Sequence, residues 1–152
     1  MMKDPPFPRQ IREDAIMTVA EIMTDTVFTL QPQDTLNDAR QLMHLAKIRH
    51  TPVTDDDGNF IGLITNRDLL ACTISRLAEI DEAVQEEIDV AISVSDVMRR
   101  DVYCVTPETS ARHAAEVLLE HKYGCLPVLK GRRLVGILTE ADYVKLALKT
   151  LE

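Results

Sequence analysis

The sequence predicts an α/β fold made from two copies of one small unit, and three observations support that prediction. The segments that begin at Val19 and Val94 carry the same side-chain types in the same order. Each segment contains a β-type run, a stretch with helical spacing and a hairpin pattern. A unit of about 55 residues buries little surface alone, so we expect the two copies to pack sheet to sheet as one pseudo-symmetric module.

The alignment of the two copies sets the domain boundaries. In the first part of each copy the equivalent pairs are Met23 with Met98, Val27 with Val102, Pro32 with Pro107, Ala39 with Ala114, Lys47 with Lys122 and Pro52 with Pro127. After a one-residue deletion in a turn, the pairs are Gly62 with Gly136, Thr65 with Thr139 and Asp68 with Asp142. We therefore expect an N-terminal extension (1–18), a first repeat (19–70), a linker helix (71–93) and a second repeat (94–152).

Within each repeat the patterns predict a short helix, a strand, a longer helix, a hairpin and a final helix, which makes a β-α-β-β-α unit after the short helix. The strands are expected at 27–30 and 102–105, each ended by a proline. The hairpins flank turns at 55–58 and 130–133. Between the repeats, the linker helix should carry its acidic residues, Asp89 among them, on its solvated side. The longer helices are predicted from apolar stripes: Ala39, Leu42, Met43 and Ala46, then Ala114, Val117, Leu118 and His121.

Composition excludes several classes of protein. The formal net charge of −8 disfavours nucleic-acid binding, which requires clustered lysines and arginines. No apolar run approaches the ~18 residues of a membrane span, and the first residues lack the apolar segment of a secretory signal. Cys72, Cys104 and Cys125 are an odd number without metal-binding spacing, which indicates a reducing compartment. We expect a cytoplasmic protein that binds neither nucleic acid nor a membrane.

The chain also lacks the motifs of common catalytic centres. It has no nucleophile elbow, no P-loop, no dinucleotide-binding glycine motif and no His-Glu-x-x-His. A helix at 113–121 carries two histidines and two glutamates, but such side chains on a solvated helix face bind no metal in most proteins. We therefore expect neither enzymatic activity nor a metal site.

One motif, present twice, carries a resemblance to a known family. Residues 62–68 and 136–142 have the pattern Gly-x-x-Thr-x-x-Asp, and each follows a strand that contains Pro-Val. Over residues 19–148 the sequence thereby resembles tandem repeats of the cystathionine-β-synthase (CBS) type. The resemblance implies a Bateman module, in which two CBS repeats pair and offer two clefts for AMP, ADP or ATP, with S-adenosylmethionine or NAD as alternatives. It also implies a homodimer that regulates an effector protein.

The chemistry of the motif agrees with such a ligand. Thr65 and Thr139 end a strand and open a helix, where unpaired backbone N–H groups suit a phosphate. Asp68 and Asp142, one turn later, can accept hydrogen bonds from ribose hydroxyls. The same Thr-x-x-Asp pair is also a plain helix cap that needs no ligand, so both interpretations stay open.

We expect the cleft of Asp68 to be the stronger site because more basic residues belong to it. In the family, basic residues two or three positions before the proline often meet the phosphates, and Arg49 and His50 stand there. The second copy has Gly124 and Cys125 instead. By analogy, the first site comprises Arg49, His50, Leu63, Thr65, Arg67, Asp68, Cys104, Val105, Tyr123 and Gly124. The weaker second site comprises Thr29, Leu30, Ile48, Ile137, Thr139 and Asp142.

Two functions of different class follow from these observations. The first is a non-catalytic sensor, in which an adenosine ligand bridges both repeats and alters a surface that an effector protein recognises. The second is a dimeric interaction scaffold with vestigial clefts. In both, helical faces around Met23 and Met98 are expected to be exposed and to pair in a homodimer.

Overall fold

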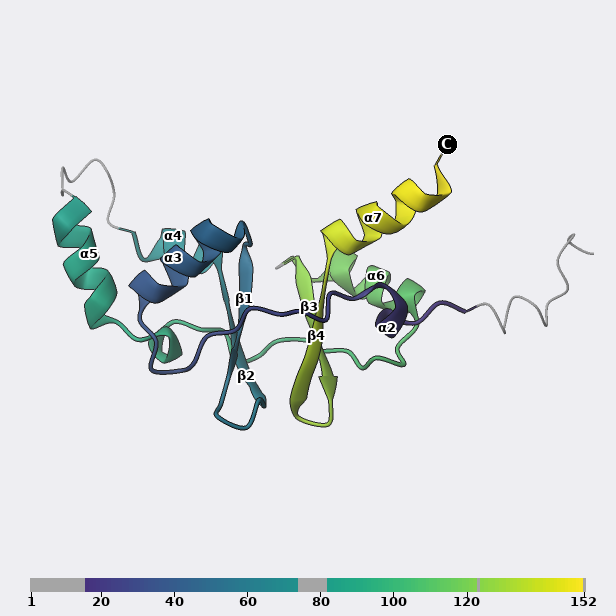
Figure 1. Cartoon of the computed structure of the whole chain (residues 1–152), viewed down its shortest axis with the longest axis horizontal. Helices are drawn as coiled ribbons and strands as arrows, with labels where there is room; N and C mark the ends of the chain where they lie inside the picture. The colour runs from purple at the N-terminus through teal and green to yellow at the C-terminus, as the bar shows by residue number, and fades with distance from the viewer. Residues whose placement is uncertain (1–15, 74–81, 123, 152) are drawn as a thin grey trace, which may run out of the picture.

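The computed structural model describes residues 16–73, 82–122 and 124–151 and shows two α/β halves side by side (Figure 1). In the first half, β1 (His50–Thr54) pairs antiparallel with β2 (Phe60–Thr65). In the second, β3 (Cys125–Lys130) pairs antiparallel with β4 (Arg133–Thr139). Leu63, Cys125 and Ile137 form a buried cluster that joins the two halves, which confirms the predicted sheet-to-sheet packing.

Helices cover the outer sides of the two sheets (Figure 1). The first half has α3 (Leu36–Ala46), α4 (Asn66–Ala71) and α5 (Glu82–Ala91), and the second has α6 (Ala111–Glu120) and α7 (Glu140–Thr150). The short segments α2 (Val19–Ile22) and η2 (Val94–Asp96) begin the two repeats. The apolar stripes predicted for the longer helices are confirmed in their buried members, which are Ala39, Met43, Ala114, Val117 and Leu118.

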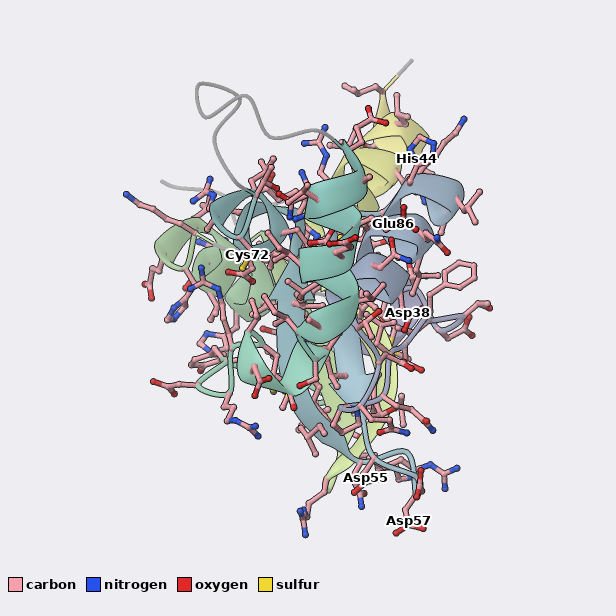
Figure 2. The ribbon with its side chains drawn as sticks, turned by 90° about the vertical axis from the view of Figure 1, so that its left-hand side faces the viewer. Asp38, His44, Asp55, Asp57, Cys72 and Glu86 are labelled. Carbon is pink, nitrogen blue, oxygen red and sulfur yellow. The ribbon has the colours of Figure 1, made fainter. Side chains whose placement is uncertain are left out.

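The first hairpin turns at 55–58, as predicted, and its tip lies far from the helices (Figure 2). The Asp55 carboxylate accepts hydrogen bonds from the backbone N–H groups of Asp57 and Asn59, both at 2.9 Å. The bond from the Asn59 backbone is the main cause of a lowered pKa for Asp55. An Asx-type turn therefore accounts for this acidic tip.

The strands predicted at 27–30 and 102–105 are wrong as extended elements. Each run makes a single parallel bridge, Leu30 with Val53 and Val105 with Val128. Leu30 donates its N–H to the carbonyl of Pro52 and accepts from Thr54 at 2.9 Å. To lengthen that ladder, residue 52 would have to donate an N–H, which proline lacks. Pro127 imposes the same limit in the second repeat.

The linker differs from one continuous helix. The helix α4 ends at Ala71, Cys72 and Thr73 form a turn, and within the described residues the helix α5 begins at Glu82. Residues 74–81 of the predicted helix lie outside the described residues. Figure 2 looks onto α5 and shows Glu86 on it.

The sequence predicted that Asp89 lies on a solvated face, but the structure buries its side chain. Its side chain is 4% exposed, and its Oδ2 lies 2.6 Å from Arg40 Nε on α3. Its Oδ1 accepts a hydrogen bond from Gln85 at 2.9 Å. Arg40 also donates to the carbonyl of Leu69 on α4. The ion pair of Asp89 with Arg40 thus connects α5 to α3. The buried Asp89 carboxylate would be unstable without the Arg40 cation.

The leading segment of each repeat packs on the other repeat. Val19 is fully buried in the hydrophobic cluster of the second half, whereas Val94 and Met98 belong to that of the first half. The exchange continues in the backbone. Arg99 donates its backbone N–H to the Leu63 carbonyl at 2.8 Å and accepts from the Leu63 N–H at 2.9 Å. Thr24 and Ile137 exchange the same two backbone hydrogen bonds, both at 2.9 Å.

Two glycines of the repeated motif make this exchange sterically possible. A Cβ on Gly62 would lie 2.5 Å from Met98 Sδ, and a Cβ on Gly136 would lie 2.5 Å from Met23 Sδ. Met98 is 7% exposed, and Met23 is partly buried against the cluster of the second half. The prediction of an exposed face around Met98 for dimer formation is therefore wrong, and Met23 is exposed only in part.

Gly62→Ala should lower the free energy of unfolding by about 1–3 kcal/mol, because the added methyl group overpacks the contact with Met98. Urea denaturation followed by circular dichroism measures the loss. The control is the double variant Gly62→Ala/Met98→Ala, in which the colliding sulfur is absent. It should lose less stability than the sum of its two single variants, and simple additivity would contradict direct packing.

Candidate functional site

The site begins at the junction of β2 and α4, where Thr65 and Asp68 form a capping box. Asp68 Oδ2 accepts hydrogen bonds from the Thr65 backbone N–H and from Thr65 Oγ1, both at 2.9 Å. Thr65 Oγ1 in turn accepts from the Asp68 backbone N–H at 3.2 Å. The capping interpretation of the motif is thus correct, and it holds one carboxylate oxygen at the helix start.

The second oxygen of Asp68 faces Arg99, a residue that the sequence interpretation missed. Arg99 Nη2 lies 2.9 Å and Nε 3.0 Å from Asp68 Oδ1. The Asp68 side chain is 10% exposed and that of Arg99 is 49% exposed. Arg99 reaches Asp68 because its backbone pairs with Leu63 on β2. The repeat alignment could have identified Arg99 as a site residue, because Arg99 occupies the position of Thr24 in the other repeat.

The second repeat has the same cap with a different third partner. Asp142 Oδ2 accepts from the Thr139 backbone N–H at 2.9 Å and from Thr139 Oγ1 at 3.4 Å. Asp142 Oδ1 accepts from Thr24 Oγ1 at 2.9 Å. Asp142 is 6% exposed, so both motif carboxylates are nearly buried. The third partner of the carboxylate therefore differs between the repeats: it is an arginine (Arg99) at Asp68 and a threonine (Thr24) at Asp142.

Of the three basic residues predicted around Asp68, Arg49 directly precedes β1, His50 begins β1 opposite Thr65, and Arg67 lies on α4. The Arg49 side chain lines a pocket of about 490 Å³ formed by the first half, together with Asn66. At about 100° per residue, Asp68 lies on the other side of α4 from Asn66. Arg67 is exposed on α4. The other basic residues of this pocket are Arg40, His44 and Lys47, and Figure 2 shows His44 near the end of α3.

One predicted pair does meet across the two repeats. A Cβ on Gly124 would lie 3.1 Å from His50 Nε2, so the imidazole packs on that glycine. Gly124 has a φ of +78°, a conformation that favours glycine. Leu63 and Ile137, predicted for different clefts, lie in the same buried cluster with Cys125.

Other predicted members are buried or lie elsewhere. Leu30 and Val105 are each 5% exposed and pack in the clusters of their own halves. Thr29 lines a separate pocket of about 200 Å³, whereas Ile48 lines the basic pocket. Leu30 and Ile48 pack in the same hydrophobic cluster of the first half, and Thr29 directly precedes Leu30 in the chain. Tyr123 lies outside the described residues.

Two thiols near the junction of the repeats are held in their neutral form. Burial raises the pKa of Cys104 to about 11. Burial, with a smaller effect of Cys104, raises the pKa of Cys125 to about 12. Cys104 donates to the carbonyl of Val102 at 3.4 Å, and neither cysteine is in a disulfide. Thiols of this kind pack as small apolar groups and are poor nucleophiles.

Two further features are absent from the described part of the chain. It contains no group of three or more His, Cys, Asp or Glu side chains that could hold a metal ion. It also contains no helix with the length and apolar character needed to cross a membrane.

Comparisons with known proteins match the whole arrangement. A model of the CBS domain matches residues 19–74 and again residues 94–149. A CBS domain-containing protein of Dictyostelium discoideum is 34% identical over 136 residues, which is 88% of this chain and 93% of that protein. The crystal structure of the CBS-pair protein CBSX2 from Arabidopsis thaliana superposes with a TM-score of 0.79 at 30% identity, covering 90% of this chain and 97% of that chain.

Two further matches concern ligand and chain length. A crystal structure of CBSX2 in complex with AMP superposes with a TM-score of 0.73 at 31% identity and covers 88% of this chain and 98% of that chain. Inosine-5'-monophosphate dehydrogenase of Methanocaldococcus jannaschii is 29% identical over 86% of this chain, but the match spans only 24% of that enzyme. The chain is thus similar to one part of a larger enzyme and to nearly all of a small CBS-pair protein.

Alkylation by iodoacetamide at pH 8 should be slow at Cys104 and Cys125 in the folded protein. A thiol with a pKa of about 11 is a thiolate in only about one molecule in a thousand at that pH. Labelling should rise as the pH approaches 11 and after unfolding in urea. Mass spectrometry of the cysteine peptides measures it, and Cys125 labelling as fast in the folded as in the unfolded chain would contradict this expectation.

Proposed function

Because the chain belongs to the CBS domain family, we propose that it is a non-catalytic regulatory module that binds an adenosine-containing ligand of the AMP, ADP or ATP class between its repeats. The observation that carries the proposal is an arrangement present in both halves. Asp68 and Asp142 are nearly buried carboxylates, each fixed at a helix start and each bonded to a segment of the other repeat. A carboxylate in that position can accept from ribose hydroxyls.

The comparisons support this ligand class. A crystal structure of CBSX2 is a complex with AMP, and this chain covers 98% of that CBSX2 chain. S-adenosylmethionine and NAD contain the same adenosine group, so they remain alternatives for the same cleft. The 11-residue helix α7 begins at Glu140, two residues before Asp142, and its positive dipole end favours a phosphate there.

The regulatory role rests on the kind of protein to which the chain is similar. Its match to inosine-5'-monophosphate dehydrogenase covers 24% of that enzyme, which leaves most of the enzyme unmatched. We therefore propose that the module regulates an effector protein, and that its ligand sets which surface the effector meets. The cytoplasmic location expected from the sequence stays a prediction, and the free thiols Cys72, Cys104 and Cys125 suit a reducing compartment.

A dimeric scaffold is the second candidate, and a specific surface favours a dimer. Leu70 on α4 and Val144 on α7 occupy the same position of the repeat, and each is 61% exposed. Leu148 on α7 is 64% exposed. In Figure 1, α4 and α7 lie toward the same end of the sheets. A surface with such internal two-fold symmetry is suited to isologous pairing with a second copy of the chain.

The ligand proposal predicts that AMP or ATP raises the melting temperature of the folded protein. A ligand that binds only the folded state adds roughly 2.7 kcal/mol at 100 times its Kd, which corresponds to roughly 5 to 10 °C for a domain of this size. Differential scanning fluorimetry measures the shift, with GMP and CMP as controls. If no adenosine compound shifts the transition at millimolar concentration, the scaffold becomes the better explanation.

Sedimentation velocity at micromolar concentration should show a homodimer. The double variant Leu70→Glu/Val144→Glu should sediment as a monomer, because both charges would be buried in the pairing surface. Val90→Glu is the matched control: Val90 is 52% exposed on α5, at the far side of the first half (Figure 1). A wild-type protein that is only monomeric would refute the dimer.

A further inference from the structure

We propose that Arg99 closes the Asp68 cleft to ribose, so that adenosine binds at Asp142. This assignment rests on the proposed function, since it distributes one ligand class between the two clefts. It reverses the order that the basic residues near Asp68 in the sequence predict. The difference arises at one repeat position, occupied by Arg99 beside Asp68 and by Thr24 beside Asp142.

At Asp68 the hydrogen-bond acceptors are already used. An ionised carboxylate offers about four acceptor positions on its two oxygens. Oδ2 accepts from the backbone N–H and the hydroxyl of Thr65, both at 2.9 Å. Oδ1 accepts from Arg99 Nη2 at 2.9 Å and Nε at 3.0 Å. A ribose diol needs acceptors from this carboxylate, so it can bind only after it displaces a charged partner that holds Oδ1 twice.

At Asp142 an acceptor position is available. Oδ2 accepts from the backbone N–H and the hydroxyl of Thr139. Oδ1 accepts from one group, the Thr24 hydroxyl at 2.9 Å. This group is neutral and can rotate about its own bond, so it can yield the carboxylate to a ribose hydroxyl and accept a bond in exchange. No cation neutralises the Asp142 charge in the ion pairs of the described residues.

Backbone hydrogen bonds hold Arg99 and Thr24 in equivalent places of the two repeats. The two carboxylates can therefore be compared at the same backbone geometry. Arg99 pairs with Leu63 on β2, and Thr24 pairs with Ile137 on β4 through the same two backbone bonds. Each residue therefore approaches its carboxylate from the same direction relative to the cap. The side chain at this position, rather than a different backbone, decides whether a cleft accepts ribose.

Isothermal titration of the full chain with AMP tests the assignment by stoichiometry. The wild type should bind one AMP per chain. Asp142→Asn should weaken that binding by about 10- to 150-fold, and by much more than Asp68→Asn does. Thr24→Arg should close the Asp142 cleft. Arg99→Thr, which copies the residue of the other repeat, should open a second site, and adding Asp68→Asn should remove that site again.

Each variant is first shown to keep the circular dichroism spectrum and cooperative melting of the wild type. If Asp142→Asn fails to fold, the added site in Arg99→Thr still tests the assignment, because it requires a gain of binding. AMP that lacks both ribose hydroxyls should bind the wild type about 10-fold or more weakly, since it makes no bond to the carboxylate.

The outcomes separate this inference from the proposed function. Two AMP molecules per wild-type chain, or loss of binding on Asp68→Asn alone, would overturn the role of Arg99 and leave adenosine binding intact. Failure of every protein, wild type and variants, to bind AMP, ADP, ATP or S-adenosylmethionine would overturn the proposed function, and the assignment of clefts with it.

Discussion

The structure depends on the reciprocal exchange of leading segments between the two repeats. Met98 covers the sheet of the first half at Gly62, and Met23 covers that of the second at Gly136, with no room for a side chain on either glycine. Val19 and Val94, fully buried, complete the core of the opposite half. Neither repeat can therefore bury its own apolar surface alone, and the two must fold as one unit.

The same exchange builds the candidate sites. The Thr-x-x-Asp cap comes from one repeat, whereas the third partner of the carboxylate, Arg99 or Thr24, comes from the leading segment of the other. The cap alone explains why threonine and aspartate stand at a helix start. It leaves one carboxylate oxygen uncommitted, and the partner supplied by exchange determines what that oxygen can still bind. On the proposed function, the helix cap uses one carboxylate oxygen and the ligand would use the other.

Local patterns predicted the features that depend on local interactions: the repeat, the caps, the hairpins and the buried helix stripes. Features that depend on distant partners were missed. Asp89 is buried because Arg40 meets it from another helix, and Met98 is buried because it packs on the preceding repeat. The short strands are wrong for the same reason, since their ladder depends on Pro52 of another strand, and proline lacks the N–H that would extend it. Arg99 was visible in the alignment, but only the backbone pairing shows that it reaches Asp68.

Because each carboxylate joins two repeats, ligand and fold are thermodynamically linked. A ribose at Asp142 would contact a residue of the second repeat that already bonds Thr24 of the first. Such a ligand binds the paired repeats and not the separated ones, so it stabilises pairing in proportion to RT ln(1 + [L]/Kd). At Asp68 the Arg99 ion pair performs this joining without a ligand. On the proposed assignment, the Arg99 ion pair joins the repeats at Asp68 at any ligand concentration, whereas pairing at Asp142 responds to the ligand, so only the Asp142 half would transmit a change in that concentration.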